Sequence, residues 1–352
     1  MHEPHIGILG TGSHVPAQTI RNEDVARTLD IDAEWISART GVDERRFARE
    51  DEATSDLATQ AARAALGNAG VTADQVDCVI VATSTPDEPL PGVACRVQSR
   101  INAPGAAAFD VNAVCSGFLY ALEIGRSMLR SDRRRKHVLV IGADTYSKIL
   151  DPTDRRTYPI FGDGAGAVLL GQVAAGEGVL GTELNSDGDL AHYVRVPAGG
   201  SRLPISAEQI SNGNHYFKMH GRLVRELVED IFPKMVDDAV AESGLSVPEI
   251  DHLICHQANV RLVEECAVKA GFTPEQLVLT GRMLANTAAA SIPIALDRAN
   301  RAGRLAPGDT VLLLTFGGGM SWGRSMLRWS AACAPAKHRL SPSNEHRYDN
   351  RV

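Results

Sequence analysis

The feature that most constrains the fold of this 352-residue chain is the alternation of short apolar runs with amphipathic segments along its length. The apolar runs have the length of buried strands, and the segments between them have the hydrophobic periodicity of helices. Strands that alternate with helices form parallel or mixed sheets with helices on both faces. The order strand, helix, strand, strand occurs in each half of the chain. We therefore predict an α/β protein built from two similar halves that pack together.

The element boundaries follow from these patterns. A helical pattern over 218–243 contains Pro233, which predicts a kink or a break. Residues 187–213 are polar and rich in Gly and Pro, and predict a mobile surface excursion. The predicted strands are 6–10, 76–82, 138–141, 179–184, 251–255, 310–315 and 323–329. The predicted helices are 22–29, 54–70, 92–101, 260–271 and 284–301. The predicted divisions are an N-terminal half, 1–173, a C-terminal half, 174–331, and a disordered tail, 332–352, of polar composition.

Charge and composition narrow the functional classes. A net charge of -7 argues against general binding of nucleic acids or anionic membranes. No apolar run has the length of a membrane span, and the N-terminus lacks the regions of a signal peptide, so we expect a cytoplasmic protein. The six cysteines are scattered without a Cys-x-x-Cys pair, so we expect reduced thiols and no metal site.

One stretch, Phe109–Leu122, combines a short buried strand, a sharp turn and an apolar helix, with Cys115 at the turn. The unpaired N–H groups and the dipole at a helix start favour negative charge. A cysteine at this position is expected to have a depressed pKa and to be present partly as thiolate. The alternative is a small buried hydrophobic residue, which is what most free cysteines are.

Other polar groups also lie at the ends of predicted strands. His256 follows one strand, Asn286 lies at the start of a predicted helix, and the glycines 317–319 follow another strand. Taken singly, each has a structural explanation: a satisfied histidine, a helix cap and a tight turn. In α/β sheets, sites gather at the carboxyl ends of strands. Together with Cys115 these groups suit acyl chemistry through a thioester, with backbone N–H groups as donors.

Several ordered motifs resemble 3-oxoacyl-(acyl-carrier-protein) synthase III, and the resemblance covers the chain from about Ile6 to Trp329. It implies the thiolase fold, with two duplicated halves in a five-layer αβαβα core, and a homodimer. The motifs are VNAVCSGF (111–118), ICHQANVR (254–261), NTAAASIP (286–293) and FGGGMSWG (316–323), together with EWI…RTG (34–41) and DPTDR…FGDGAG (151–166).

The resemblance implies a decarboxylative Claisen condensation that initiates fatty-acid or polyketide synthesis. Cys115 would take the acyl group of an acyl-CoA starter, with the N–H groups of Cys115 and Gly318 as the oxyanion hole. His256 and Asn286 would bind the thioester carbonyl of malonyl-acyl carrier protein. Their hydrogen bonds would stabilise the enolate left by CO2 loss, which then attacks the acyl-cysteine. No cofactor is implied.

The binding residues are also carried over from the resemblance. Trp35 and Arg155 would sandwich the adenine of coenzyme A, and Arg39 would contact the nucleotide. From the local sequence alone, Trp35 four residues before Arg39 is better explained by a Trp packed under an Arg stem, and the resemblance reverses that preference. Arg261 and Lys269 match the basic surface that docks the acidic carrier protein.

The chain departs from the family pattern at a few positions. Ala285 replaces a usual glycine and Ala288 a common serine, and both crowd Asn286. Arg222 and Arg225 stand near the pantetheine tunnel, where the family more often has a small polar and an aromatic residue.

One departure from the family pattern, in the acyl pocket, bears on the choice of starter acyl group. The resemblance assigns Phe316 and Leu90 to this pocket, and Leu90 stands where the family often has a Phe that reaches in from the partner subunit. The shorter plug predicts a pocket that accepts starters longer than acetyl. The alternative functions are a non-decarboxylating acyltransferase that passes the acyl group to another acceptor, and a non-catalytic member of the fold.

Overall fold

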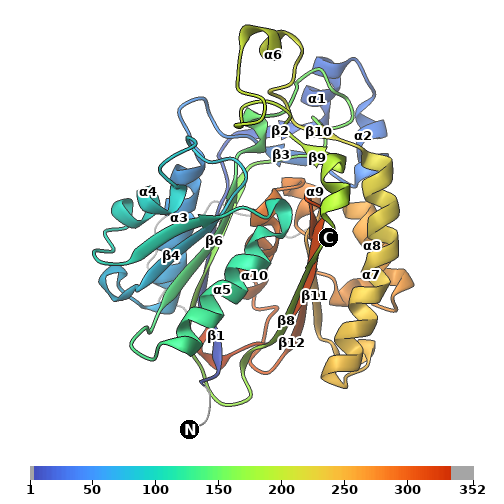
Figure 1. Cartoon of the computed structure of the whole chain (residues 1–352). Helices are drawn as coiled ribbons and strands as arrows, with labels where there is room; N and C mark the ends of the chain where they lie inside the picture. Colours follow the sequence, from blue (N-terminus) through green and yellow to red (C-terminus); the bar gives the residue numbers. More distant parts are fainter. Residues whose placement is uncertain (1–3, 334–352) are drawn as a thin grey trace, which may run out of the picture.

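The computed structural model describes residues 4–333, which form five layers in the order helix, sheet, helix, sheet, helix (Figure 1). The two sheets stand nearly upright in this view, with helices between them and on both outer sides. This arrangement confirms the predicted α/β class and the five-layer αβαβα architecture.

The N-terminal sheet has five strands in the order β1-β7-β6-β4-β5. Strands β4, β5 and β6 are parallel to one another, whereas β7 is antiparallel to β6 and β1. Strand β5 forms one edge of this sheet. The bounds are β1 (Ile6–His14), β4 (Cys78–Ala82), β5 (Ala107–Val111), β6 (Val138–Asp144) and β7 (Gly164–Gln172).

The C-terminal sheet has four strands in the order β11-β12-β13-β8. Strands β11 and β12 are parallel, and the other pairs are antiparallel. Every residue of β12 is buried, as expected of a central strand with helices on both faces. The bounds are β8 (Gly178–Ser186), β11 (His252–Cys255), β12 (Thr310–Gly317) and β13 (Ser321–Arg328).

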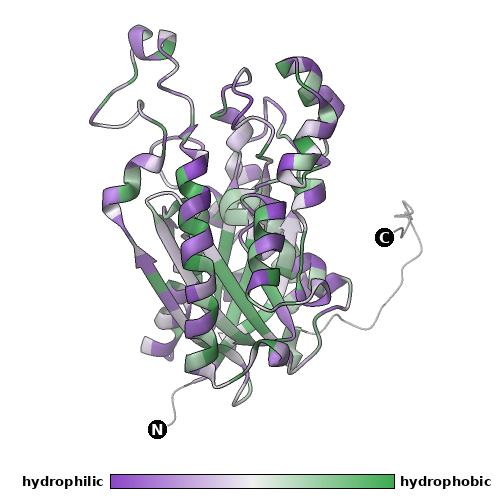
Figure 2. Ribbon diagram, turned by 90° about the vertical axis from the view of Figure 1, so that its right-hand side faces the viewer, coloured by the Kyte–Doolittle hydropathy of each residue, from purple (hydrophilic) through white to green (hydrophobic). Residues whose placement is uncertain are grey.

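Two helices, α5 (Gly117–Ser131) and α10 (Ser291–Arg301), form the central layer between the sheets. They share one apolar cluster with the inner faces of both sheets, including Phe118, Ile292 and Leu313. In Figure 2 the green, apolar residues run through the interior in the same way. Both helices start near the upper ends of the sheets, which brings residues 115 and 291 into one region.

The outer layers pack on the other face of each sheet. Helices α3 (Thr54–Ala69) and α4 (Val93–Arg100) cover the N-terminal sheet, and α7 (Gly221–Ser243) and α8 (Val260–Lys269) cover the C-terminal sheet. Each face has its own buried cluster, so both sheets are buried on both sides.

Short elements form a cap at one end of the layers, at the top of Figure 1. The cap elements are α1 (Asn22–Leu29), α2 (Ala33–Thr40), β2 (Thr19–Arg21), β3 (Glu44–Arg46), β9 (Val194–Arg195), β10 (Lys218–Met219) and α6 (Ala207–Ser211). A further short helix, α9 (Gly281–Leu284), lies just below them.

Glycines allow helices to pack directly on the strands of the N-terminal sheet. A Cβ on Gly12, within β1, would lie 2.3 Å from the backbone N of Ala65, so helix α3 lies directly on the strand. The predicted first strand, 6–10, therefore continues to His14. A Cβ on Gly166 would lie 2.5 Å from the backbone N of Ile294 on the opposite face. These contacts explain the glycines without a phosphate loop.

Two predicted helix boundaries were wrong. Helix α7 continues through Pro233 without a break, because its apolar face, including Phe232 and Val236, is packed against the C-terminal sheet. The helix predicted to begin at 284 begins at Ser291, and a tight turn over 285–290 precedes it.

The predicted surface excursion and the predicted tail agree with the structure only in part. The excursion 187–213 contains the short elements β9 and α6. The predicted tail starts at 332, but the turn Ala331–Cys333 is formed and Cys333 is buried. The rest of the tail lies outside the described residues. Between residues 4 and 333, no helix has the length and apolar character to cross a bilayer.

Candidate active site

Cys115 lies in a single 3-10 turn (Val114–Ser116) between β5 and α5, and its side chain is 9% exposed. The turn is held against the end of β12. The Thr315 hydroxyl donates to the Cys115 carbonyl over 3.3 Å, and a Cβ on Gly317 would lie 3.0 Å from the Cys115 nitrogen. Only glycine at 317 therefore allows the two backbones to approach this closely.

The predicted thiolate at Cys115 is wrong for the unliganded enzyme. Burial raises the pKa of the Cys115 thiol well above its ordinary value, and the negative charge of nearby Asp144 raises it further. Hydrogen bonds from the backbone N–H groups of Cys115 and Gly318 to the sulfur act in the opposite direction but are weaker. The helix start does favour the anion, but desolvation outweighs it.

His256 follows strand β11 and is 1% exposed. Its Nδ1 lies 3.2 Å from the Ser291 hydroxyl, and the Phe316 ring packs edge-on with centroids 5.4 Å apart. Burial lowers the pKa of His256 to about 3, although a hydrogen bond with the Ala288 backbone opposes the shift. The imidazole is therefore neutral at physiological pH.

Asn286 lies in the turn before α10 and is 4% exposed. Its backbone N–H donates to the Ile160 carbonyl over 2.9 Å, and its Oδ1 accepts the Ala288 N–H over 2.8 Å. Because Oδ1 is occupied, the carboxamide is oriented and its NH2 group is available as a donor. Asn286 is thus held by a local side-chain-to-backbone turn and does not cap a helix.

Ala288 connects the three predicted catalytic residues. It packs with Cys115 in one buried cluster, its N–H binds the Asn286 side chain, and its backbone is hydrogen-bonded to His256. The structure thus gathers residues separated by more than a hundred positions in the chain around one turn. The group holds a thiol, a neutral imidazole and an oriented carboxamide.

An aromatic wall that the sequence analysis missed packs in the same cluster as Cys115. The rings of Tyr146 and Phe161 stack with centroids 4.6 Å apart, and Phe217 packs edge-on against both. These residues come from three distant segments and follow no common spacing. No local signal could have identified them, since only the fold brings them together.

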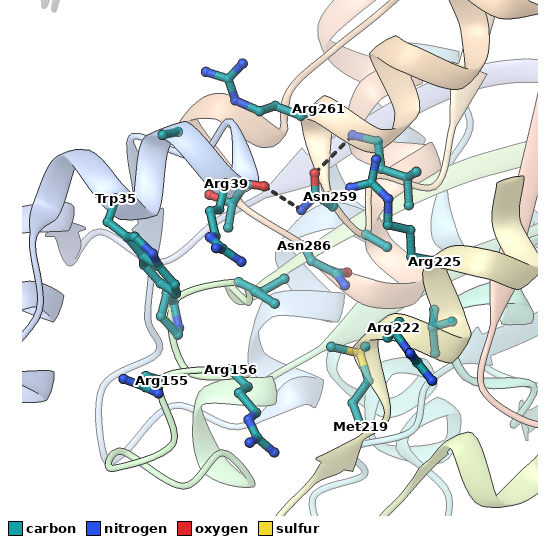
Figure 3. Close-up of a pocket in the computed structure, with 18 of the residues that line it drawn as sticks. Trp35, Arg39, Arg155, Arg156, Met219, Arg222, Arg225, Asn259, Arg261 and Asn286 are labelled. Atoms are coloured by element: carbon teal, nitrogen blue, oxygen red, sulfur yellow. Dashed lines mark hydrogen bonds between the residues drawn. The ribbon is translucent and has the colours of Figure 1, made fainter.

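A pocket of about 1290 Å³ extends from Asn286 to the surface between α2, the loop 155–160 and the starts of α7 and α8 (Figure 3). Its lining is strongly basic, with two carboxylates, Asp32 and Glu265, among its side chains. Trp35, Arg39, Arg155 and Arg261, predicted from the sequence, all line it. The arginines of the lining are Arg39, Arg155, Arg156, Arg222, Arg225 and Arg261.

Trp35 and Arg39 satisfy both sequence interpretations. The Arg39 guanidinium lies over the Trp35 ring, 5.1 Å from its centroid, which is a cation–π contact. Trp35 is nevertheless 37% exposed, and in Figure 3 its ring stands at the pocket wall near Arg155. A flat ligand can therefore reach the indole.

Two predicted site residues, Leu90 and Lys269, lie away from this group within the single chain, and a third, Phe316, packs against His256. Leu90 is 80% exposed, on the loop between β4 and α4. Lys269 is the last residue of α8 and does not line the pocket. Phe316 is buried behind His256 and packs with the outer apolar cluster of the C-terminal sheet.

Within the described part of the chain, His, Cys, Asp and Glu side chains form no group of three or more that could hold a metal ion. The site itself holds a thiol, an imidazole, a carboxamide and backbone N–H donors.

Comparison with family models gives two matches. The 3-oxoacyl-[acyl-carrier-protein (ACP)] synthase III model matches residues 109–188, and the model of that family's C-terminal region matches residues 240–329. The first range contains Cys115, and the second contains His256, Asn286 and Gly318.

Individual proteins match over nearly the whole chain. An acetoacetyl CoA synthase of Streptomyces is 44% identical, covering 94% of this chain and 100% of the relative. A beta-ketoacyl-[acyl-carrier-protein] synthase III of Caldanaerobacter subterraneus is 42% identical, covering 92% and 98%. The crystal structure of 3-oxoacyl-(acyl carrier protein) synthase III from Pseudomonas aeruginosa matches with a TM-score of 0.85 at 37% identity, covering 93% and 98%.

Proposed function

The chain belongs to the 3-oxoacyl-[acyl-carrier-protein] synthase III family, and we propose that Cys115, His256 and Asn286 are its catalytic residues. The enzyme is a thiolase-fold acyltransferase that condenses a starter unit to initiate fatty-acid or polyketide synthesis. The observation that supports the assignment is the turn at Ala288, which is hydrogen-bonded to Asn286 and His256 and belongs to the same buried cluster as Cys115.

The first step is acyl transfer to Cys115. The sulfur attacks the thioester carbonyl of an acyl-CoA, the carbon–sulfur bond to coenzyme A breaks, and the thiol proton leaves with the coenzyme A sulfur. The N–H groups of Cys115 and Gly318 already point at the cysteine sulfur, so they are placed to stabilise the oxyanion of the intermediate. The aromatic wall of Tyr146, Phe161 and Phe217 provides the apolar surroundings for the acyl chain.

The second step is decarboxylation of a malonyl thioester. Loss of CO2 leaves an enolate, whose oxygen needs neutral donors in a dry site. We propose that the Asn286 amide and the His256 imidazole supply these donors. The Asn286 Oδ1 already accepts the Ala288 N–H, which leaves the NH2 group of Asn286 to donate, and the imidazole is neutral. The enolate carbon then attacks the acyl-cysteine carbonyl and releases the Cys115 sulfur.

We propose that the basic pocket holds coenzyme A, whose phosphates require positive charge and whose adenine requires a flat surface. Trp35 supplies the flat surface at the pocket mouth. Arg39, Arg155 and Arg156 form no ion pair with a carboxylate among the described residues, so their charge is available to phosphates. Arg261 and Lys269 then present positive charge on α8 to an acidic carrier protein.

We propose that the working enzyme is a homodimer and that Leu90 closes the acyl pocket of the partner subunit. Two observations support this. Leu90 is 80% exposed although it is a large apolar side chain, and β5, which leads into the Cys115 turn, is an edge strand of its sheet.

Intact mass after incubation with a panel of acyl-CoA thioesters tests the function. We expect one acyl adduct on the wild type and on Cys95→Ser, an exposed-cysteine control, and none on Cys115→Ala. Malonyl-carrier protein should then release CO2 and discharge the adduct. Discharge to an acceptor without CO2 release would instead establish the non-decarboxylating alternative, and absence of any adduct would exclude catalysis by Cys115.

A second candidate is condensation on a coenzyme A thioester in place of a carrier protein. The relative named acetoacetyl CoA synthase supports it, and so does the charge at the pocket mouth. Arg225 is paired with Glu229 and Glu265, and Arg282 with Glu264, which reduces the positive charge available for docking. A kcat/KM for malonyl-CoA equal to or above that for malonyl-carrier protein would favour this candidate.

A further inference from the structure

A buried carboxylate that the mechanism above does not use lies beneath the site. Asp144 is the last residue of β6, and its side chain has no exposed surface. Among the described residues no Arg, Lys or His forms an ion pair with it. Burial of a carboxylate without an ion-pair partner destabilises the folded state unless hydrogen bonds satisfy its oxygens. The groups that donate these hydrogen bonds therefore indicate the role of Asp144.

The two oxygens of Asp144 bind two different loops. Oδ1 accepts the Ser84 N–H over 2.9 Å and the Thr85 hydroxyl over 2.9 Å, with the Thr83 and Ser84 hydroxyls at 3.2 and 3.1 Å. Oδ2 accepts the Ala289 N–H over 3.0 Å. The carboxylate is therefore a bridge between the loop that starts at Thr83 and the turn 285–290.

The turn 285–290, which is bound by Oδ2, contains Asn286 and must be stabilised by contacts with other parts of the chain. Ala285 and Ala288 have φ angles of +57° and +47°, which L-residues adopt only when the surroundings enforce them. The Asn286 side chain is oriented by the N–H of Ala288, one residue before Ala289. A shift of Ala289 would therefore move the carboxamide directly.

The loop on the Oδ1 side is the one that carries Leu90 at its exposed end. Ser84 also lies 3.1 Å from the Tyr146 hydroxyl, so the same hydrogen-bond network reaches the aromatic wall around Cys115. Through Oδ1, Asp144 is thus connected to the aromatic wall around Cys115, where the acyl group would bind. Through Oδ2, it is connected to the Asn286 turn, where the malonyl thioester would bind.

From this geometry we propose that Asp144 is a positioning residue that couples the Thr83–Gly92 loop to the Asn286 turn, so that decarboxylation depends on its two-sided hydrogen bonding. The proposal rests on the proposed function of Asn286. Asp144 touches no substrate, and its role is to hold the donors of the second step in place. A secondary effect follows from its charge, which opposes ionisation of Cys115.

Asp144→Asn keeps the shape of the side chain but replaces one accepting oxygen by an NH2 donor. One of the two loops therefore loses its hydrogen bond to residue 144. We expect CO2 release from malonyl-carrier protein to fall by about tenfold or more, while acylation of Cys115 stays within about threefold of wild type.

Asp297→Asn is the matched control. Asp297 is 1% exposed and accepts the hydroxyls of Thr11 and Ser13, but it lies on α10 away from both loops. It should lower stability without separating the two steps. If Asp144→Asn lowers acylation and CO2 release in parallel, as the control does, or leaves both unchanged, Asp144 is a structural residue only and the proposal is overturned.

Should Asp144→Asn fail to fold, Thr85→Val keeps the β-branched shape and leaves Asp144 in place. It removes one donor to Oδ1 and also the acceptor of the Thr145 N–H. It should show the same separation in smaller degree, and an unchanged ratio of the two steps would contradict the proposal. If the wild-type enzyme forms the adduct but releases no CO2, the proposed function itself is overturned. If the wild-type enzyme is active and Asp144→Asn changes neither step, only the proposal for Asp144 is overturned.

Discussion

Strained backbone concentrates around the catalytic turn. Ala285 has φ +57° and ψ −157°, a conformation that is essentially confined to glycine. The family more often has glycine at this position, so the chain bears a cost that a single substitution can remove. The strain lies one residue before Asn286, which suggests that it is tolerated because the tertiary contacts of the turn enforce it.

Ala285→Gly should therefore stabilise the protein by about 1 kcal/mol, because glycine enters this conformation without a Cβ clash. Urea unfolding measures the change. Ala290→Gly is the control: Ala290 has φ −78° and ψ −14°, and glycine there should destabilise by about 0.5–1 kcal/mol. Equal effects of the two substitutions would show that Ala285 is not strained.

The neutral state of His256 gives a pH prediction. Because burial lowers its pKa to about 3, the imidazole does not gain a proton as the pH falls through the ordinary histidine range. CO2 release from malonyl-carrier protein by pre-acylated enzyme should show no loss of rate near pH 6.5. A fall in rate centred there would mean that the imidazole is solvated and protonated in the working enzyme.

At the scale of elements, Asp163 joins two segments that lie far apart in sequence. Its oxygens accept the N–H groups of Ala48 and Ser147 and the Ser147 hydroxyl. Burial raises the pKa of Asp163 to about 6, so the folded protein holds this proton more tightly than the unfolded chain.

The sign of the pH effect follows from that shift. The neutral carboxyl contributes stability below the unfolded pKa of about 3.9, and this contribution is lost as the pH rises through about 6. Asp163→Asn should therefore flatten the dependence of the unfolding free energy on pH between about 4 and 6. Urea midpoints across this range measure it, and identical slopes for both proteins would contradict the pKa shift.

Helix α7 carries a second element-scale prediction. Pro233 is exposed in the middle of a continuous helix and cannot donate to the Glu229 carbonyl one turn before it. Pro233→Ala should stabilise the protein by about 1–3 kcal/mol, since it restores the donor and removes the ring clash. Lys234→Ala, one residue on, is the control with little expected change, and a loss of stability in Pro233→Ala would show that the ring shapes the helix for packing.

At the scale of the whole molecule, the exposed Leu90 leads to a prediction about the starter that the enzyme accepts. If Leu90 closes the partner's acyl pocket, Leu90→Phe fills more of that space. The preference for acetyl-CoA over longer acyl-CoA starters should then rise by about tenfold, the usual effect of a small change in pocket size. Competition assays with mixed acyl-CoA thioesters measure this ratio, and an unchanged preference would place Leu90 outside the pocket.

The sequence by itself determined the fold class and the candidate residues, because both depend on local information. Strand and helix periodicity is a property of neighbouring residues, and Cys115, His256 and Asn286 each stand beside a recognisable end of an element.

Tertiary structure alone decided the electrostatics and the shape of the site. The thiol of Cys115 is neutral because two sheets desolvate it and Asp144 lies nearby, and neither fact is encoded in the helix that follows it. The turn at Asn286 and the aromatic wall around Tyr146 also depend on contacts between distant segments. A pKa and a strained turn are set by the three-dimensional surroundings, which no local pattern of residues specifies.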